Sequence, residues 1–165
     1  NYDSDLDKIL SILKQIVPHL EKEDIYLGIE NHENCLAREL AYLVENLGSK
    51  HVGICLDTVN SFGTLETPKQ VVDVLSPYVI NLHFKDFKIE RIDHKMGLVI
   101  SGSPAGEGKL DINWLLDNVI KDRENMNIIL EQWPPFNETI DKTIIMENNW
   151  AENGIKFLKD LIPKK

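Results

Sequence analysis

Residues 54–60, Ile-Cys-Leu-Asp-Thr-Val-Asn, join an apolar run to a carboxylate. The run covers residues 52–56, and a run this apolar is typical of a strand buried on both faces, as in a parallel sheet. Asp57 follows it directly. Because parallel α/β proteins place their functional residues where such strands end, Asp57 is the first candidate for a functional side chain.

Three other apolar segments end in the same way. Strands are predicted over residues 25–31, 51–57, 78–84 and 127–132. Each delivers one group that can bind a metal ion, and the four groups are Glu30, Asp57, His83 and Glu131. Since side chains alternate between the two faces of a strand, His83 and Lys85 are expected on one face and Leu82 and Phe84 on the other.

Helical segments separate these strands. The spacing of apolar residues predicts helices over residues 5–20, 36–47, 68–76, 112–121 and 140–162, the last as one or two helices. Residues 86–110 form a long polar segment that we interpret as a loop, and its apolar residues 97–100 allow a short hairpin. Alternating strands and helices predict a parallel sheet in a single α/β domain over residues 1–165.

The four strand-end groups favour a shared metal site. Three carboxylates that converge alone repel one another, and a divalent cation removes that repulsion. One imidazole with three carboxylates suits Mn²⁺ or Mg²⁺, with Zn²⁺, Co²⁺ or Fe²⁺ as alternatives. A single carboxylate at a strand end is usually a solvated residue or a helix cap. The hypothesis therefore depends on its repetition in four strands.

Charge and cysteine content exclude several classes of protein. The net charge is −9, which argues against nucleic acid as a partner, because phosphate binding needs a basic surface. No stretch approaches the ~18 apolar residues of a membrane span, so no membrane association is expected. With two cysteines, Cys35 and Cys55, and no secretory signal at the start, we expect a cytoplasmic protein without disulfides.

These motifs together resemble the xylose isomerase-like superfamily of TIM barrels, the sugar phosphate isomerases and epimerases. The similarity rests on five segments in matching order, which are residues 29–32 (IENH), 56–60 (LDTVN), 83–86 (HFKD), 106–111 (GEGKLD) and Glu131. It covers nearly the whole chain but only the C-terminal half of the family's barrel, strands 5–8. The resemblance therefore implies half of a (β/α)8 barrel.

The resemblance implies a chemistry for the strand-end residues. In the family's epimerase branch the matching groups bind one metal ion, and the matching glutamates exchange a proton with the substrate. Carried over, Glu30 and Glu131 would move a proton beside a carbonyl while the metal stabilises an enediolate. Lys85 would add positive charge near the developing oxyanion. The implied activity is isomerisation or epimerisation of a sugar or polyol, with a lyase or dehydratase on a keto-sugar or inosose as the alternative.

One position departs from the family pattern. Many members carry histidine three residues after the strand-end aspartate, and this chain has Asn60. An asparagine can hydrogen-bond a sugar hydroxyl but is a poor metal ligand and no base. This departure weighs against a specific ketose 3-epimerase. It also weighs against a DNA-cleaving site with three metal ions, for which too few strand-end histidines remain.

Four residues near the strand ends have a functional and a structural interpretation. His32 could contact substrate or orient Glu30, or it could be a solvated loop residue. Trp133 could form an apolar wall for a sugar ring, or it could pack in the core. Asp86 could support Lys85 or His83 from behind, or it could be a simple loop residue. Glu107 could mark a tight turn near the site or a bare turn.

Half a barrel leaves two sheet edges to be covered. A complete barrel of this kind needs about 250 residues, more than this chain has. We therefore expect either that the chain is part of a longer protein with an N-terminal barrel half, or that two copies associate. The further alternative is a truncated barrel that binds a metal or a sugar without catalysis.

Overall fold

The computed structural model describes residues 5–121, 123 and 126–161. The chain forms two compact units, each described here by itself. The first comprises Asn1–His83 and Asn113–Ile128, and the second comprises Phe84–Ile112 and Ile129–Lys165.

Four strands form one sheet in the order β1-β2-β3-β6. Their bounds are β1 Leu27–Glu30, β2 Val52–Asp57, β3 Val79–Phe84 and β6 Asn127–Leu130. The pairs β1–β2 and β2–β3 are parallel, which confirms the predicted α/β class with parallel strands. The register sets Asp57 level with His83, and Glu30 level with Cys55. The backbone of Glu30 therefore lies two residues further than Asp57 from the carboxyl end of the sheet. Its longer side chain reaches across part of this distance.

Three helices of the first unit lie where the sequence predicts, although the first ends three residues later than expected. They are α1 Leu6–Glu23, α2 Ala37–Leu47 and α3 Pro68–Leu75. The side chain of Asp5 caps α1, and Thr67 and Gln70 form a capping box at α3. Gly48 ends α2 in the left-handed conformation, with φ of 61°, which glycine adopts without steric cost.

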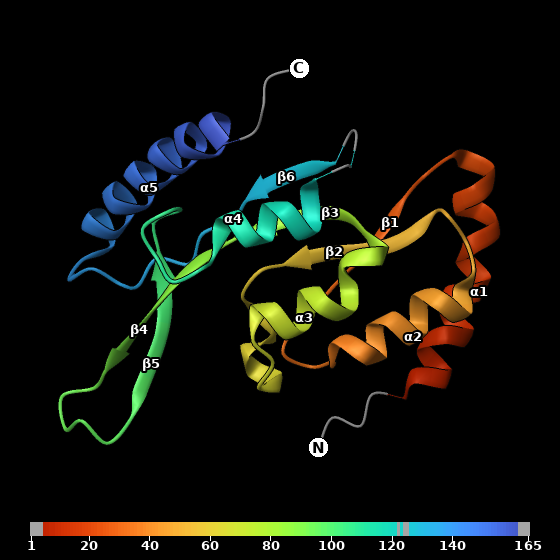
Figure 1. The fold of residues 1–165 in the computed structure, drawn as a ribbon, viewed down its shortest axis with the longest axis horizontal. Helices are drawn as coiled ribbons and strands as arrows, with labels where there is room; N and C mark the ends of the chain where they lie inside the picture. The colour runs from red at the N-terminus through yellow and green to blue at the C-terminus, as the bar shows by residue number, and fades with distance from the viewer. Residues whose placement is uncertain (1–4, 122, 124–125, 162–165) are drawn as a thin grey trace. The chain divides into compact units, whose positions relative to one another are not determined.

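The helices α2 and α3 lie side by side and cover one face of the sheet (Figure 1). The buried side chains between them are almost all aliphatic: Leu40, Leu43, Ile54, Leu56, Val71, Val72, Leu75 and Leu82. Burying each side chain of this kind stabilises the fold by about 1.5–3 kcal/mol. This packing holds the strands in place, so the polar residues at their carboxyl ends are carried on a rigid support.

The segment predicted as a long loop is instead a hairpin in the second unit. It consists of β4 Asp86–Arg91 and β5 Leu98–Ser103, paired antiparallel with Ile89 opposite Ile100. The short hairpin that the sequence allowed here is present, and it is longer than expected. In β4 the apolar Phe87 and Ile89 alternate with charged residues, a period-two pattern that the high charge of the segment obscured.

The last two helical segments follow the prediction with one difference. Residues Ile112–Leu115 form α4, and Leu116–Ile120 continue as a π-helical turn, η3, in place of a regular helix. Residues Ile140–Leu161 form one helix, α5. The predicted end of that helix at residue 162 lies outside the described residues.

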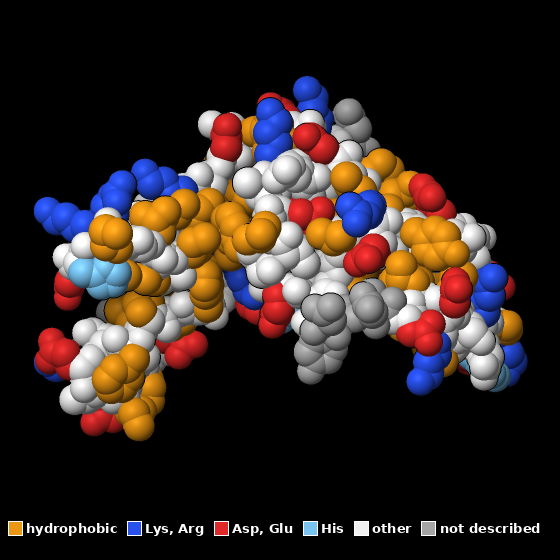
Figure 2. Space-filling model, turned by 90° about the horizontal axis from the view of Figure 1, so that it is seen from below, with side chains coloured by type: hydrophobic (Ala, Val, Ile, Leu, Met, Phe, Trp, Pro, Cys, Tyr) orange, Lys and Arg blue, Asp and Glu red, His pale blue; other side chains and the backbone are white. Residues whose placement is uncertain are grey.

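Large apolar side chains are exposed on the second unit. They occur on β5 and its turn and on α5 with the residues before it, and they are Met96, Leu98, Val99, Phe136, Ile140, Ile144 and Ile145. Figure 2 shows hydrophobic side chains gathered on this part of the molecule. Exposed apolar side chains in such number are typical of a surface that packs against other protein. No helix in the described part of the chain is both long and apolar enough to cross a membrane.

Candidate metal centre

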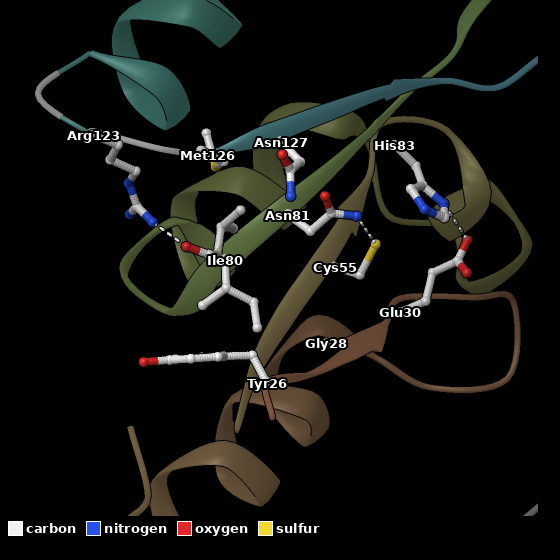
Figure 3. Close-up of a pocket in the computed structure, with 11 residues that line it drawn as sticks. Tyr26, Gly28, Glu30, Cys55, Ile80, Asn81, His83, Arg123, Met126 and Asn127 are labelled. Atoms are coloured by element: carbon white, nitrogen blue, oxygen red, sulfur yellow. Dashed lines mark hydrogen bonds and ion pairs between the residues drawn. The ribbon is translucent and has the colours of Figure 1, made fainter. Parts of the chain in front are cut away.

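Three of the predicted ligands meet at the carboxyl ends of adjacent strands. Glu30, Asp57 and His83 each offer one ligand atom, and these atoms lie within 4.8 Å of one another. His83 Nδ1 is 3.4 Å from Glu30 Oε1. Figure 3 shows the two side chains turned toward each other. The first unit alone therefore supplies two carboxylates and an imidazole at one point.

Glu131, the fourth predicted ligand, follows β6 and belongs to the second unit. Its backbone N–H donates to the carbonyl of Phe84 at 3.0 Å, and Phe84 is the residue after His83. Its membership in the metal centre remains a prediction.

The turn after β2 fixes the carboxylate of Asp57. Its Oδ1 accepts hydrogen bonds from the backbone N–H groups of Val59 and Asn60, both at 2.8 Å. Aspartate favours such a turn because its short side chain reaches the backbone two or three residues ahead. Asp57 is only 1% exposed, so this carboxylate has little water to stabilise its charge.

Asn31 holds the backbone of Asp57 from the neighbouring strand. Its side-chain oxygen accepts from Asp57 N at 2.7 Å, and its Nδ2 donates to the Asp57 carbonyl at 2.9 Å and to Ser61 Oγ at 3.0 Å. Asn31 is fully buried. Its amide thus extends the pairing of β1 with β2 beyond Glu30. Sequence reasoning assigned Asn31 no role, because a motif does not show which backbone groups an amide will meet.

Asn60 hydrogen-bonds to two of the proposed metal ligands. Its Nδ2 donates to Glu30 Oε1 at 2.9 Å, while its backbone N–H bonds to Asp57. The sequence analysis gave Asn60 a substrate hydroxyl as its partner, and that role remains a prediction. The structure adds the contact with Glu30.

Lys85 lies in the second unit and pairs with Glu131. Its Nζ is 2.7 Å from Glu131 Oε1, and its side chain is only 9% exposed. Burial of the Lys85 side chain and its ion pair with Glu131 together fix the position of the ammonium group. This position is compatible with the predicted role of Lys85 beside a developing negative charge.

His32 is placed differently from the three converging ligands. Its side chain is half exposed and forms an ion pair with Glu33. The structure thus favours the solvated loop interpretation of His32, and its predicted contact with substrate remains untested.

Asp86 organises the loop that follows β5. Its carboxylate accepts backbone hydrogen bonds from Phe87, Gly106, Gly108 and Leu110, at 2.8–3.1 Å. Gly108 is required here, because a Cβ atom at this position would collide with the Asp86 carboxylate. Asp86 thus anchors residues 106–110, in accord with the loop interpretation, and its predicted support of Lys85 or His83 remains a prediction.

Trp133 lies beside the same anchor in the second unit. Its Nε1 donates to the Asp86 carbonyl at 3.2 Å, and its backbone approaches Gly102 so closely that no Cβ atom would fit there. The indole is thereby fixed and only partly buried. A fixed, partly exposed indole is compatible with a wall for a sugar ring. Glu107, between the two glycines of this loop, is exposed, in accord with the bare-turn interpretation.

An open hollow of about 920 Å³ lies along the sheet of the first unit and reaches Glu30 and His83 (Figure 3). Small and polar residues contribute to its lining, among them Gly28, Cys55, Asn81 and Asn127. Asn81 Nδ2 donates to Cys55 Sγ at 3.1 Å. Sequence reasoning assigned Cys55 to the core and overlooked Asn81. Counting back two residues from Asp57 and from His83 would have found both, since they share those strand faces.

The donor set fits a divalent cation. An imidazole with carboxylate oxygens matches ions of the Mg²⁺, Mn²⁺ and Zn²⁺ type. Burying the charge of Asp57 beside that of Glu30 costs free energy unless a cation compensates it, and a metal ion at this point supplies that compensation. A cluster of candidate metal ligands at the carboxyl ends of parallel strands, with helices outside the sheet, is typical of an α/β protein of the TIM-barrel type.

Comparisons with known proteins place the chain in one family. The model of the xylose isomerase-like TIM barrel matches residues 1–161. The chain therefore belongs to the xylose isomerase-like TIM-barrel family, as the sequence motifs predicted. It is 32% identical over 152 residues to a 3-oxo-isoapionate decarboxylase of Pectobacterium atrosepticum, an alignment that covers 92% of this chain and 55% of the relative.

Solved structures show the same fold. A xylose isomerase domain protein from Planctomyces limnophilus matches with a TM-score of 0.72 at 15% identity, over 94% of this chain and 53% of its own. A family member from Mycobacterium smegmatis in complex with magnesium matches with a TM-score of 0.65 at 12% identity, over 89% and 49%. A D-psicose 3-epimerase matches with a TM-score of 0.63 at 16% identity, over 95% and 56%. This chain thus spans about half the length of these proteins.

Proposed function

We propose that this chain carries the metal-binding part of an enzyme that converts a keto-sugar or a related polyol through an enediolate. The observation that carries this proposal is the convergence of Glu30, Asp57 and His83 within 4.8 Å at the carboxyl ends of their strands. In barrels of this type that edge of the sheet is where catalytic residues lie. Mn²⁺ or Mg²⁺ is the proposed ion, with Zn²⁺ or Co²⁺ as alternatives.

Each residue has a defined part in this proposal. Glu30, Asp57, His83 and Glu131 hold the metal ion, which polarises the substrate carbonyl when bound. Glu30 and Glu131 exchange a proton with the carbon beside that carbonyl. Lys85 places its ammonium near the negative charge that develops on oxygen. His32, Asn60 and Trp133 are proposed contacts for the carbohydrate.

Isomerisation or epimerisation is the first candidate reaction, and decarboxylation is the second. An enediolate forms either when a base removes a proton from the carbon next to the carbonyl or when a carboxylate attached to that carbon leaves as carbon dioxide. The 32% identity to a 3-oxo-isoapionate decarboxylase favours the second route. It supports the lyase alternative that the sequence analysis kept open.

The rest of the barrel is the proposed partner of this chain. The relatives are about twice as long as the part that aligns, and apolar side chains are exposed on the second unit. We propose that an N-terminal barrel half, or a second copy of the chain, covers these surfaces. Without such a partner the chain would be a metal- or sugar-binding fragment that does not catalyse.

Metal binding is the first test. Calorimetric titration with Mn²⁺ should show one site, and Asp57→Asn should weaken binding at least tenfold because it removes a buried anionic ligand. Asp117→Asn is the matched control, since Asp117 is exposed and pairs only weakly with Lys121. A chain that binds no divalent cation, or an Asp57→Asn variant that binds as tightly as the unaltered chain, would contradict the proposed site.

The reaction is tested with the barrel complete. Keto-sugars incubated in D₂O should gain deuterium beside the carbonyl if a proton is exchanged, and keto-sugar acids should release carbon dioxide if decarboxylation occurs. Glu30→Gln and Glu131→Gln should each lower the rate at least a hundredfold. Full activity in both variants would exclude the proposed acid–base roles.

A further inference from the structure

Asn60 makes two hydrogen bonds that connect two of the proposed ligands. Its backbone N–H donates to Asp57 Oδ1 at 2.8 Å, and its side-chain Nδ2 donates to Glu30 Oε1 at 2.9 Å. Glu30 extends from β1, whereas Asn60 begins the turn that follows β2. The side chain of Asn60 therefore connects the ends of two neighbouring strands through a carboxylate.

The contact has a consequence for the orientation of Glu30. A glutamate that is more than a third exposed loses several freely rotating torsions when it is fixed, and this loss opposes metal binding. The amide of Asn60 holds Oε1, which also lies 3.4 Å from His83 Nδ1. The hydrogen bond from Asn60 therefore fixes the Glu30 carboxylate beside His83, the neighbouring proposed ligand.

Asn60 is itself held in place. Asp57, to which its backbone is bonded, is fixed on the other side by Asn31, which exchanges two hydrogen bonds with the Asp57 backbone. Asn31, the residue after Glu30, thus holds the backbone of Asp57. Asn60, the third residue after Asp57, holds the side chain of Glu30. These two asparagines form a reciprocal connection between the ligands, so the orientation of Asn60 does not depend on a metal ion.

We propose that Asn60 is a positioning residue, which holds the carboxylate of Glu30 beside His83 in the orientation that binds the metal ion. This inference rests on the proposed function, because it assumes that Glu30 is a ligand. It gives the side chain of Asn60 a role in metal binding by orienting Glu30. Outer partners that orient a ligand typically change metal affinity 10- to 100-fold, so the effect is measurable.

The test compares Asn60→Ala with Asn118→Ala by calorimetric titration of Mn²⁺ into the chain. Alanine at position 60 retains the backbone N–H that bonds to Asp57 and removes only the amide that holds Glu30. Asn118 is the matched control, an asparagine whose Nδ2 donates to the backbone carbonyl of Trp114. We expect Asn60→Ala to weaken Mn²⁺ binding about tenfold or more and Asn118→Ala to leave it unchanged.

Two further measurements separate positioning from a structural role. Unfolding midpoints of the metal-free proteins, measured with EDTA, should change little in Asn60→Ala, since its contact with Glu30 is partly exposed. In a Glu30→Ala background, Asn60→Ala should have no further effect on Mn²⁺ affinity, because its target is already absent.

The outcomes are distinct. Unchanged Mn²⁺ affinity in Asn60→Ala overturns this inference while leaving the metal site intact. A tenfold loss that persists without Glu30 also overturns it, because Asn60 would then act through another group. Failure of the unaltered chain to bind Mn²⁺ overturns the proposed function together with the inference.

Discussion

Lys85 and Glu131 form an ion pair of 2.7 Å in which the ammonium is almost entirely buried. Lys88 and Glu90 form a pair of the same length, but the Lys88 side chain is 42% exposed. An equal distance therefore does not imply an equal contribution to stability. Exposed pairs contribute about 0–1 kcal/mol, whereas removing one partner of a buried pair leaves a charge without compensation.

The first prediction compares these two lysines. Lys85→Met should lower the free energy of unfolding by about 1–3 kcal/mol, because the partly exposed Glu131 loses its compensating charge. Lys88→Met should change it by less than about 1 kcal/mol. Urea unfolding followed by circular dichroism measures both. Equal effects of the two substitutions would show that burial of Lys85 has no energetic consequence.

Asn31 is the subject of the second prediction. Asn31→Ala removes the two hydrogen bonds that the Asn31 amide forms with the N–H and carbonyl of Asp57, at a fully buried position. We expect a loss of about 2–4 kcal/mol in the free energy of unfolding. Asn118→Ala, which removes an exposed contact, should cost less than about 1 kcal/mol. A loss no larger in Asn31→Ala than in this control would contradict the role of Asn31.

A third prediction concerns the glycines of the second unit. Gly108→Ala places a Cβ atom against the Asp86 carboxylate and the Phe87 carbonyl, neither of which can move without breaking the loop anchor. We expect a destabilisation of about 2–4 kcal/mol. At Gly97 the first atom met is the terminal methyl of Ile92, at 3.0 Å, which can rotate away. Thermal unfolding of Gly97→Ala should therefore stay close to that of the unaltered chain.

The fourth prediction concerns alkaline pH. The pKa of Tyr78 is raised above 10.0, first by the hydrogen bond that its hydroxyl donates to Glu45, then by burial and by the negative charge of Glu45. Because the pKa is higher in the folded state, this contact stabilises the fold fully below pH 10, and the stabilisation is lost as the pH rises through the folded-state pKa.

Ultraviolet titration of tyrosinate measures this shift. The signal that disappears in Tyr78→Phe belongs to Tyr78, and in Glu45→Ala that signal should move to lower pH. The difference in stability between the unaltered chain and Tyr78→Phe should be constant below pH 10 and decrease above it. A Tyr78 signal that does not move in Glu45→Ala would contradict the assigned cause.

The strands and the convergence of three strand-end groups were predictable from the sequence because each depends on a local pattern. Continuous apolar runs ending in Glu30, Asp57 and His83 identify parallel strands and the polar residues that follow them. The extent of the hairpin was underestimated because Lys88 and Glu90 obscured the alternation of Phe87 and Ile89. Charged residues on the exposed face of a strand reduce the apolar signal without changing its period.

The contacts that support the site could not be read from the sequence, because their partners are distant along the chain. Asp86 bonds to backbone groups as far as 24 residues away, and Asn31 bonds to Asp57 across 26 residues. Neither distance has a local signature. The same holds for Asn60, whose partner Glu30 lies 30 residues earlier.

Three backbone amides at the turn after β2 would report metal binding in nuclear magnetic resonance spectra, although they are not proposed ligands. The backbone amides of Val59 and Asn60 point at the carboxylate of Asp57, and the amide of Asp57 points at Asn31. Charge withdrawn from that carboxylate by an ion would shift the resonances of these three amide protons. The occupancy of the site could thus be followed in solution without labelling or altering any ligand.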